Sequence, residues 1–316
     1  MRVLVTGGAG FIGSNLVFAL LSGGHDVGVI DDMSTGKAEN IHPYAWFRTL
    51  DILDPAMPAA VAEFAPDAVV HLAAQASVSA SLRDPERDFA VNAEGTRAVA
   101  RAAREAGATR MISASSAAVY GEPDASQLPL PETALKAPAN PYGMSKLAAE
   151  GTMAAELAGT GTDFAAFRFA NVYGPRQDAA GEGGVVALFC ASISAGISPV
   201  VFGTGEQTRD FIYVGDIVAA ILAALLSENP LARGEGDDDA SYNISTGSET
   251  SVNELLMSLR QTASFLGAVD SQPAREGDVD RSSLGPSKAQ RVFGWAARQE
   301  LDTGLSMTWR WFASRA

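Results

Sequence analysis

The chain has 316 residues, of which 47% are hydrophobic and 19% charged, and its formal net charge is −14 at pH 7. This composition is typical of a soluble globular protein with one large or two unequal domains. The acidic charge argues against a nucleic-acid partner, because affinity for nucleic acid comes mainly from Lys and Arg on phosphates. No stretch has the roughly 20 apolar residues of a membrane span, and no signal peptide is visible, so we expect a cytoplasmic protein without a membrane partner.

Cysteine and histidine are too scarce for a metal cluster. Cys190 is the single cysteine, which excludes an internal disulfide, and the histidines are His25, His42 and His71. Zinc sites in proteins need several such residues at short spacing. We therefore expect no metal site.

Short apolar runs alternate with longer helical patterns over the first 170 residues. We predict strands and helices for the following ranges: strands 2–6, 27–31, 68–73, 109–114 and 162–169, and helices 11–23, 55–64, 85–107 and 141–159. This alternation predicts an α/β fold, a Rossmann-like doubly wound parallel sheet with helices on both faces. After about residue 170 the regularity fades, which indicates a smaller α+β domain, with 234–240 (GEGDDDA) as a solvated loop.

Four glycines occur in TGGAGFIG (6–13), directly after the first predicted strand. Gly7, Gly10 and Gly13 lie where a tight turn lets backbone approach a ligand and lets the following helix pack on the sheet. The unpaired N–H groups and the dipole at that helix start suit a pyrophosphate. Asp31 ends the next strand, where a carboxylate accepts hydrogen bonds from an adenine ribose and repels a 2′-phosphate. The pattern favours NAD over NADP; the alternative is a Rossmann-like scaffold without a ligand.

One Tyr-x-x-x-Lys pair is present, formed by Tyr142 and Lys146. On a helix this spacing puts both side chains on one face. The ordinary pKa of a tyrosine hydroxyl is about 10, and a neighbouring ammonium and a positively charged nicotinamide ring both favour the phenolate. Tyr142 is therefore predicted to be a general base. The alternative is an exposed Tyr and Lys without a catalytic role.

The motifs together resemble the extended short-chain dehydrogenase/reductase family, and within it the NAD-dependent nucleotide-sugar epimerases of the UDP-glucose 4-epimerase group. The matching segments follow the order of that family: GGAGFIG (7–13), DDMSTG (31–36), HLAAQASV (71–78), SSAAVYG (115–121), PYGMSK (141–146), RFANVYGP (168–175), QTRDFIYVGD (207–216) and AREGD (274–278). The resemblance implies that residues 1–170 and about 214–246 form the NAD-binding Rossmann domain. Residues 171–213 and 247–316 would form the nucleotide-sugar-binding domain.

The resemblance implies Ser116, Tyr142 and Lys146 as the catalytic residues, with the Ser116 hydroxyl bonded to the sugar oxygen. Ser115 remains an alternative to Ser116, and a serine that only caps its own backbone is the structural alternative for either. Asn92 resembles a family asparagine whose helix lies against the nicotinamide side of the cofactor. The alternative for Asn92 is an ordinary asparagine on a helix surface.

Further binding residues are implied by the same resemblance. Those expected to bind NAD are Gly7, Gly10, Phe11, Ile12, Gly13, Asp31, Asp32, Ser34, Thr35, Gly36, Asp51, Ile52, Leu72, Ala73, Ala74, Gln75, Asn92, Ala114, Tyr142, Lys146, Phe169 and Val172. Those expected to bind the substrate are Ser116, Tyr142, Asn171, Arg176, Val186, Arg209, Arg275, Asp278 and Ser282. The guanidinium groups of Arg209 and Arg275 suit diphosphate oxygens; surface ion pairs with Asp210 or Asp278 are the alternative.

Ala117 and Ala118 stand where related 4,6-dehydratases carry an acidic residue, and alanine cannot transfer a proton. The resemblance therefore implies 4-epimerisation of a UDP-sugar, UDP-glucose or UDP-galactose, through a transient 4-keto sugar with NAD retained. Three alternatives remain: a UDP-glucuronate 4-epimerase with Arg176 as counter-charge, another nucleotide-sugar oxidoreductase of the family, and a catalytically silent nucleotide-sensing protein.

Two finer expectations concern the sugar and the assembly. By resemblance, Ser282 occupies the position where a bulky residue restricts the hexose epimerases, so its small side chain implies room for the N-acetylhexosamine pair. The Ala-rich helices 85–107 and 141–159 correspond to the helices that pair in family dimers, which implies a homodimer. The alternative is that their small residues face the sheet.

Overall fold

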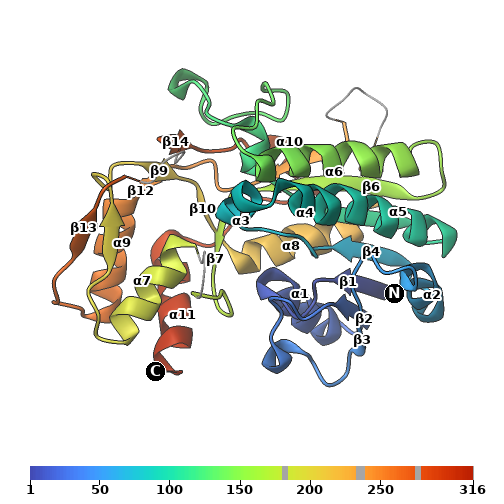
Figure 1. Ribbon diagram of the computed structural model, residues 1–316, viewed down its shortest axis with the longest axis horizontal. Coiled ribbons are helices and arrows are strands. Elements are labelled where there is room, and N and C mark those ends of the chain that lie inside the picture. The colour runs from blue at the N-terminus through green and yellow to red at the C-terminus, as the bar shows by residue number, and fades with distance from the viewer. Residues whose placement is uncertain (180–183, 233–238, 275–278, 316) are drawn as a thin grey trace.

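The computed structural model describes residues 1–179, 184–232, 239–274 and 279–315. A seven-stranded sheet forms the larger part of the molecule, in the order β11-β6-β5-β4-β1-β2-β3 (Figure 1). Its strands, all paired in parallel, are β1 (Arg2–Thr6), β2 (Asp26–Asp31), β3 (Trp46–Thr49), β4 (Ala68–His71), β5 (Arg110–Ser116), β6 (Asp163–Phe169) and β11 (Ser241–Ile244). The predicted Rossmann-like fold is confirmed, and the strand order reverses between β1 and β4, where such sheets bind ligands.

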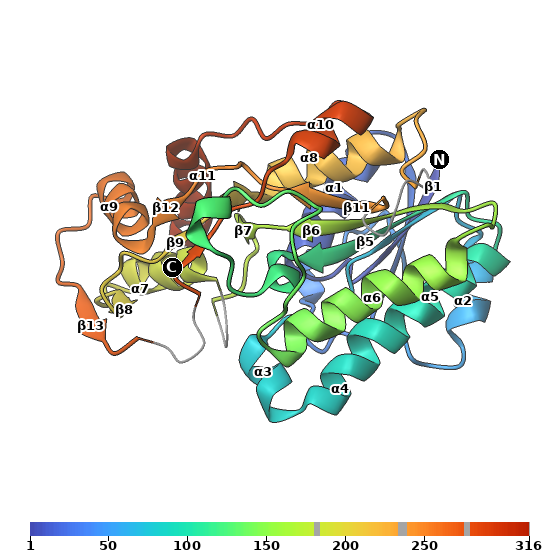
Figure 2. The same ribbon diagram turned by 90° about the horizontal axis from the view of Figure 1, so that it is seen from above.

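Helices cover both faces of the sheet (Figure 2). On one face lie α1 (Phe11–Ser22), α8 (Val214–Leu225) and α10 (Ser287–Phe293); on the other lie α2 (Met57–Phe64), α5 (Gly95–Glu105) and α6 (Pro141–Leu157). Side chains alternate along β1, so that Val3 and Val5 pack with the first set of helices and Leu4 with the second. Strands buried on both faces explain the continuous apolar runs of the sequence.

The predicted helix 85–107 is continuous but not uniform. It consists of α4 (Pro85–Phe89), a π-helical turn (Ala90–Glu94) and α5, and it follows the short helix α3 (Val78–Arg83). π-helical turns are rare and occur frequently at functional sites. This one brings Asn92 into the interior, where the side chain is 1% exposed.

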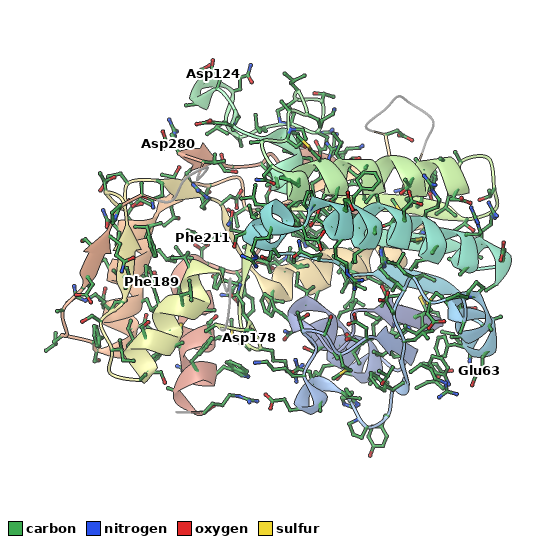
Figure 3. The ribbon with its side chains drawn as sticks, viewed as in Figure 1. Glu63, Asp124, Asp178, Phe189, Phe211 and Asp280 are labelled. Carbon is green, nitrogen blue, oxygen red and sulfur yellow. The ribbon has the colours of Figure 1, made fainter. Side chains whose placement is uncertain are left out.

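The smaller lobe is α+β, as predicted. Its elements are β7 (Asn171–Tyr173), β8 (Val200–Phe202), β9 (Thr208–Arg209), β10 (Phe211–Tyr213), β12 (Thr250–Ser251), β13 (Asp270–Gln272), β14 (Arg281–Ser282), α7 (Val185–Ser194), α9 (Val252–Ala263) and α11 (Leu301–Ala313). Phe189 and Phe211, labelled in Figure 3, belong to its apolar core together with Leu255 and Leu305. A capping box begins α9, in which Ser251 and Glu254 bond each other's backbone N–H groups.

The loop after β7 contacts the larger lobe through two polar interactions. Asn15 Nδ2 donates to the Pro175 carbonyl at 3.0 Å, and Lys37 Nζ lies 3.1 Å from the Oδ1 of Asp178, which is labelled in Figure 3. The smaller lobe is thereby connected to α1 and to the loop after β2, which are the elements that carry the predicted dinucleotide site. No helix within the described ranges combines the length and apolarity that a membrane span requires.

Candidate active site

The glycine-rich loop lies directly on the segment after β4. Gly7 has a φ of 72°, and a Cβ there would lie 2.6 Å from the Ala73 nitrogen. A Cβ on Gly13 would overlap the Gly7 carbonyl, so α1 packs on the loop at backbone distance. Gly10 precedes α1 and caps it without a side chain, which leaves the first N–H groups of the helix without a side-chain acceptor. These features fit a pyrophosphate at this position.

Asp31 ends β2 beside this loop and is 6% exposed. Its Oδ2 accepts a hydrogen bond from the Ala9 nitrogen at 2.9 Å, and its Oδ1 accepts one from the Met33 nitrogen at 2.9 Å. Burial raises the pKa of Asp31, while these two backbone donors lower it. Each carboxylate oxygen keeps acceptor capacity, as binding a ribose diol requires. Asp32 differs, because it accepts hydrogen bonds from the nitrogen and hydroxyl of Ser34.

The remaining residues expected at the cofactor lie on the same edge of the sheet. The segments directly after β2, β3 and β4 carry, in that order, Ser34, Thr35 and Gly36; Asp51 and Ile52; and Leu72, Ala73, Ala74 and Gln75. Near the ends of β5 and β6 lie Ala114 and Phe169, and β7 contains Val172. The carboxyl ends of parallel strands meet at one edge, which is the ligand-binding edge of doubly wound sheets. The glycine cradle and the Asp31 carboxylate thus fit NAD.

Ser116, Tyr142 and Lys146 come together between β5 and α6. Ser116 is the last residue of β5, and Asn140 caps α6 by accepting a hydrogen bond from the Gly143 nitrogen at 2.9 Å. This cap places Tyr142 in the first turn of α6, where the Ser116 side chain is near enough to lower the pKa of its hydroxyl. One turn on, Lys146 Nζ donates to the Ala114 carbonyl at 3.1 Å.

The two adjacent serines have different partners. Ser115 Oγ donates to Glu150 Oε1 at 2.5 Å and is buried. Ser116 Oγ accepts from the Ala118 nitrogen at 3.2 Å, so it caps the following turn, and it also meets Tyr142. The geometry therefore favours Ser116 over Ser115 as the residue beside Tyr142.

The expected depression of the Tyr142 pKa by Lys146 is wrong for the protein alone. Burial raises the pKa of Tyr142; the Ser116 hydrogen bond lowers it, and the charge of Asp88 raises it further. Lys146 Nζ lies 6.0 Å from the centroid of the Tyr142 ring and donates to a carbonyl. Burial lowers the pKa of Lys146 to about 8, against the charges of Asp88 and Glu150, which raise it.

Asn92 connects the segment after β4 to α6. Its Nδ2 donates to the Gln75 carbonyl at 3.0 Å and to Ser145 Oγ at 2.9 Å, while its Oδ1 accepts from the Gln75 nitrogen at 2.9 Å. The alternative of an exposed helix asparagine is therefore wrong. Asn92 instead fixes the cofactor-side loop to the helix that carries Tyr142.

His71 lies at the end of β4, outside the predicted site residues. Thr96 Oγ1 donates to the Asn92 carbonyl at 2.6 Å and lies 3.1 Å from His71 Nε2. Because the Thr96 hydroxyl donates its hydrogen to the Asn92 carbonyl, it can only accept a hydrogen bond from His71. The ring proton of His71 therefore lies on Nε2, and Nδ1 accepts from Thr6 Oγ1 at 2.7 Å. Burial lowers the pKa of His71 to about 3, so the ring is neutral. The sequence signal that marks His71 is its position at the end of a buried strand.

The predicted substrate residues belong mainly to the smaller lobe. Ser282 and Arg209 are direct neighbours in the parallel pair of β14 and β9. Arg209 Nη1 donates to the Thr208 carbonyl at 2.7 Å, and Asn171 begins β7. The expected contacts Arg275 and Asp278 lie outside the described residues.

Three expectations on the substrate side need correction. Val186 is 1% exposed and packs in the core of the smaller lobe, so its side chain is not available to a ligand. Arg176 donates to the Ser14 carbonyl at 3.0 Å and lies over the Phe18 ring, which does not support a role as counter-charge for a uronic acid. Asp210 is not a surface partner for Arg209, because it is 1% exposed and accepts hydrogen bonds from Thr246 and Gly247.

Comparison with known proteins identifies the family. The family model described as the NAD dependent epimerase/dehydratase family matches residues 3–245. The chain belongs to this family. The chain is also 40% identical over 325 residues to the UDP-glucose 4-epimerase of Mycolicibacterium smegmatis, covering 100% of both sequences.

Solved structures of this family are similar over the whole chain. The Thermotoga maritima UDP-glucose 4-epimerase with UDP-glucose has a TM-score of 0.93 at 38% identity, covering 100% of this chain and 99% of that one. The UDP-N-acetylglucosamine 4-epimerase of Methanobrevibacter ruminantium, in complex with UDP-N-acetylmuramic acid, has a TM-score of 0.91 at 31% identity with the same coverage. The resemblance predicted from the motifs is confirmed.

Proposed function

We propose that this protein is an NAD-dependent 4-epimerase that interconverts UDP-glucose and UDP-galactose. The observation that carries the proposal is the contact of Tyr142 with Ser116, one helical turn from Lys146 and on the edge of the sheet that carries the glycine-rich loop. Full-length identity of 40% to a UDP-glucose 4-epimerase supports the same reaction. A protein with only a scaffold role would have no need of this arrangement.

The glycine-rich loop and Asp31 would hold NAD, which would supply a hydride acceptor for C4 of the sugar and, once reduced, the donor that returns the same hydride. Tyr142 takes the proton of the 4-hydroxyl as a phenolate and later returns it; because burial raises its pKa, the phenolate depends on the positive charge that bound NAD would bring. Ser116 holds the sugar oxygen through its hydroxyl, and Lys146 provides positive charge near the phenol. Because Ala117 and Ala118 offer no group for proton transfer, water is not eliminated from the keto sugar, and reduction on the other face gives the epimer.

The nucleotide has to stay bound while the keto sugar rotates. We assign this anchoring to Asn171 and Arg209 in the smaller lobe and to Arg275 and Asp278. A guanidinium group matches the geometry of phosphate oxygens, and in an acidic protein such a cation concentrates positive charge locally. In this division, residues 1–170 and about 214–246 bind NAD, and residues 171–213 and 247–316 bind the nucleotide sugar, except that α10 packs on the sheet of the larger lobe.

A second substrate pair is supported by Ser282. This serine lies beside Arg209 in the strand pairing and carries a small side chain. Unused space in a pocket costs much less affinity than a steric clash, so a pocket with a serine here accepts a 2-acetamido group. We therefore propose additional activity on UDP-N-acetylglucosamine and UDP-N-acetylgalactosamine.

We also propose a two-fold homodimer formed through α3, α4 and α6. Leu82 is 60%, Phe89 45% and Met144 54% exposed on these neighbouring helices. Ala100 and Ala103 of α5 face the sheet instead, so the exposed apolar side chains, rather than alanines, would form the contact. Light scattering at micromolar concentration tests this assembly, and a monomer there would refute it.

The function itself is tested by incubating the purified protein with each of UDP-glucose, UDP-galactose, UDP-N-acetylglucosamine and UDP-glucuronate. NMR spectra resolve the 4-epimers, and absorbance detects reduced nicotinamide. We expect epimers from the first three and no accumulation of NADH. Steady NADH release would indicate a net dehydrogenase, and activity on UDP-glucuronate alone would indicate the uronic-acid reaction.

A further inference from the structure

A buried ion pair joins α6, the helix that carries Tyr142 and Lys146, to the neighbouring strand β6. Arg168 in β6 is 1% exposed and contacts Glu150 in α6 through two parallel hydrogen bonds, Nε to Oε1 at 2.9 Å and Nη2 to Oε2 at 2.6 Å. This bidentate geometry is the strongest form of an Arg–carboxylate contact and fixes the two groups in one relative orientation.

The other donors of Arg168 are also satisfied. Its Nη1 donates to the Tyr120 hydroxyl at 2.9 Å and to the Glu132 carbonyl at 3.1 Å, and its Nη2 also donates to Ser241 Oγ at 3.2 Å. These bonds, with the two to Glu150, use all five N–H groups of the guanidinium. The contacts come from the turn after β5, the loop that carries Glu132, and β11, so the guanidinium connects segments far apart in the sequence.

The carboxylate end of the pair contacts the strand that ends at the active site. Glu150 Oε1 accepts from Ser115 Oγ at 2.5 Å, and Ser115 is the residue before Ser116. Along α6, Tyr142, Lys146 and Glu150 follow one another at intervals of four residues and share one helix face. One carboxylate therefore sets both the position of Ser116's strand and the rotation of the helix that carries Tyr142.

We propose that Glu150 and Arg168 are positioning residues, which fix the register of α6 on β5 and β6 so that Tyr142 meets Ser116. A buried ion pair contributes less to stability than a well-packed apolar pair, so its benefit lies in defining one geometry. An apolar contact at this position tolerates a small slide of the helix, whereas a bidentate pair does not. This inference rests on the proposed function for its kinetic part.

The pair also acts on Lys146. The titratable groups that face Lys146 are Asp88, Glu150, His71 and Tyr142, and the carboxylates of Asp88 and Glu150 favour the charged ammonium. Loss of the Glu150 charge should therefore lower the pKa of Lys146, which reports that the charge near the site has changed, while the position of Tyr142 is judged from kcat. The Lys146 titration needs no substrate.

The deciding variant is the double substitution Glu150→Gln with Arg168→Met. Removing one charge alone leaves the other buried without a partner and can unfold the chain, whereas replacing both groups by uncharged side chains of similar volume leaves neither charge of the pair unpaired. The matched control is Glu63→Gln, because Glu63 forms an ion pair with Arg48 at the same 2.6 Å but at an exposed position, labelled in Figure 3.

We expect the double variant to keep a cooperative thermal transition and to lose about 10–100-fold in kcat with KM changed less than about threefold, the result of a misplaced catalytic group. The four lysines of the chain allow Lys146 to be titrated by NMR with 13C-labelled lysine, and its pKa should fall below that of the unmodified protein. Glu63→Gln should change neither quantity.

Unchanged kcat in a folded double variant would overturn the inference. If the unmodified protein shows no epimerase activity, the proposed function fails. A crystal structure of the folded double variant then still decides on the inference, because a Tyr142 displaced from Ser116 supports it and an unmoved Tyr142 refutes it.

Discussion

Tyr142, in the first turn of α6, lies beside Ser116 at the end of β5, close enough for the Ser116 side chain to lower the pKa of the Tyr142 hydroxyl. In a 4-epimerase the 4-hydroxyl of the sugar has to reach both groups. Replacing Tyr142 by Phe removes the acid–base group without altering the packing of the ring. We expect kcat to fall by about 10²–10⁴, the usual contribution of a positioned acid or base. Binding of the nucleotide sugar, measured by calorimetry, should persist; near-normal turnover in this variant would place the base elsewhere.

Asp31 accepts two backbone N–H groups and keeps acceptor capacity toward a ribose. We expect Asp31→Ala to weaken NAD binding by about 10–100-fold, as the loss of hydrogen bonds to a charged acceptor does. Removal of the negative charge should also raise the affinity for NADP relative to NAD. Calorimetric titration of cofactor-depleted protein with both dinucleotides measures the two effects. An unchanged preference for NAD would show that another group distinguishes NAD from NADP.

His71 predicts a specific pH dependence of stability. Its pKa is about 3 in the folded chain, against 6.5 as the ordinary value. As the pH falls below 6.5, the unfolded chain binds a proton that the folded chain does not, so stability decreases down to about pH 3 and is unaffected above 6.5. The maximum slope for one proton is about 1.4 kcal/mol per pH unit. Urea unfolding at several pH values should show a smaller slope over this window for His71→Asn than for the unmodified protein; parallel curves would contradict the assignment.

Ser282 predicts selectivity between two substrate classes. The variant Ser282→Tyr should lose activity on the N-acetylated pair by at least about 10-fold, because a clash with the acetamido group costs several times RT. Activity on UDP-glucose and UDP-galactose should change much less. Steady-state kinetics with both pairs measures the ratio, and equal losses on both would reject the steric explanation.

Much of the fold was predictable because its signals are local. The five predicted strands of the sheet are recognisable as apolar runs, and Gly7, Gly13 and Asp31 stand at fixed spacing around the first of them. β11 was not predictable in this way, since its buried Ser241 and Asn243 read as polar until their partners are known. β3 is a short edge strand with the exposed Arg48, which weakens its apolar pattern in the same way.

The candidate site was likewise predictable where its signals are local in the sequence, and not where they depend on tertiary contacts. The spacing of Tyr142 and Lys146 on one helix face could be inferred from the sequence, whereas their pKa values depend on burial that only the packed structure shows. The ion pair of Glu150 and Arg168 joins a helix to a strand by tertiary contact, and no short-range pattern marks it. The position of the Arg176 guanidinium against α1 also depends on how the lobes meet.

The most direct test of the proposed reaction follows the hydrogen on C4. UDP-glucose labelled with deuterium at C4 is incubated with the purified protein without added cofactor, and the UDP-galactose formed is analysed by NMR and mass spectrometry. If the C4 hydrogen is removed and returned within one active site, the product retains the deuterium at C4, and the buffer contributes no hydrogen to that carbon. A product that has lost the label at C4, or a reaction that requires stoichiometric NAD consumption, would contradict the account.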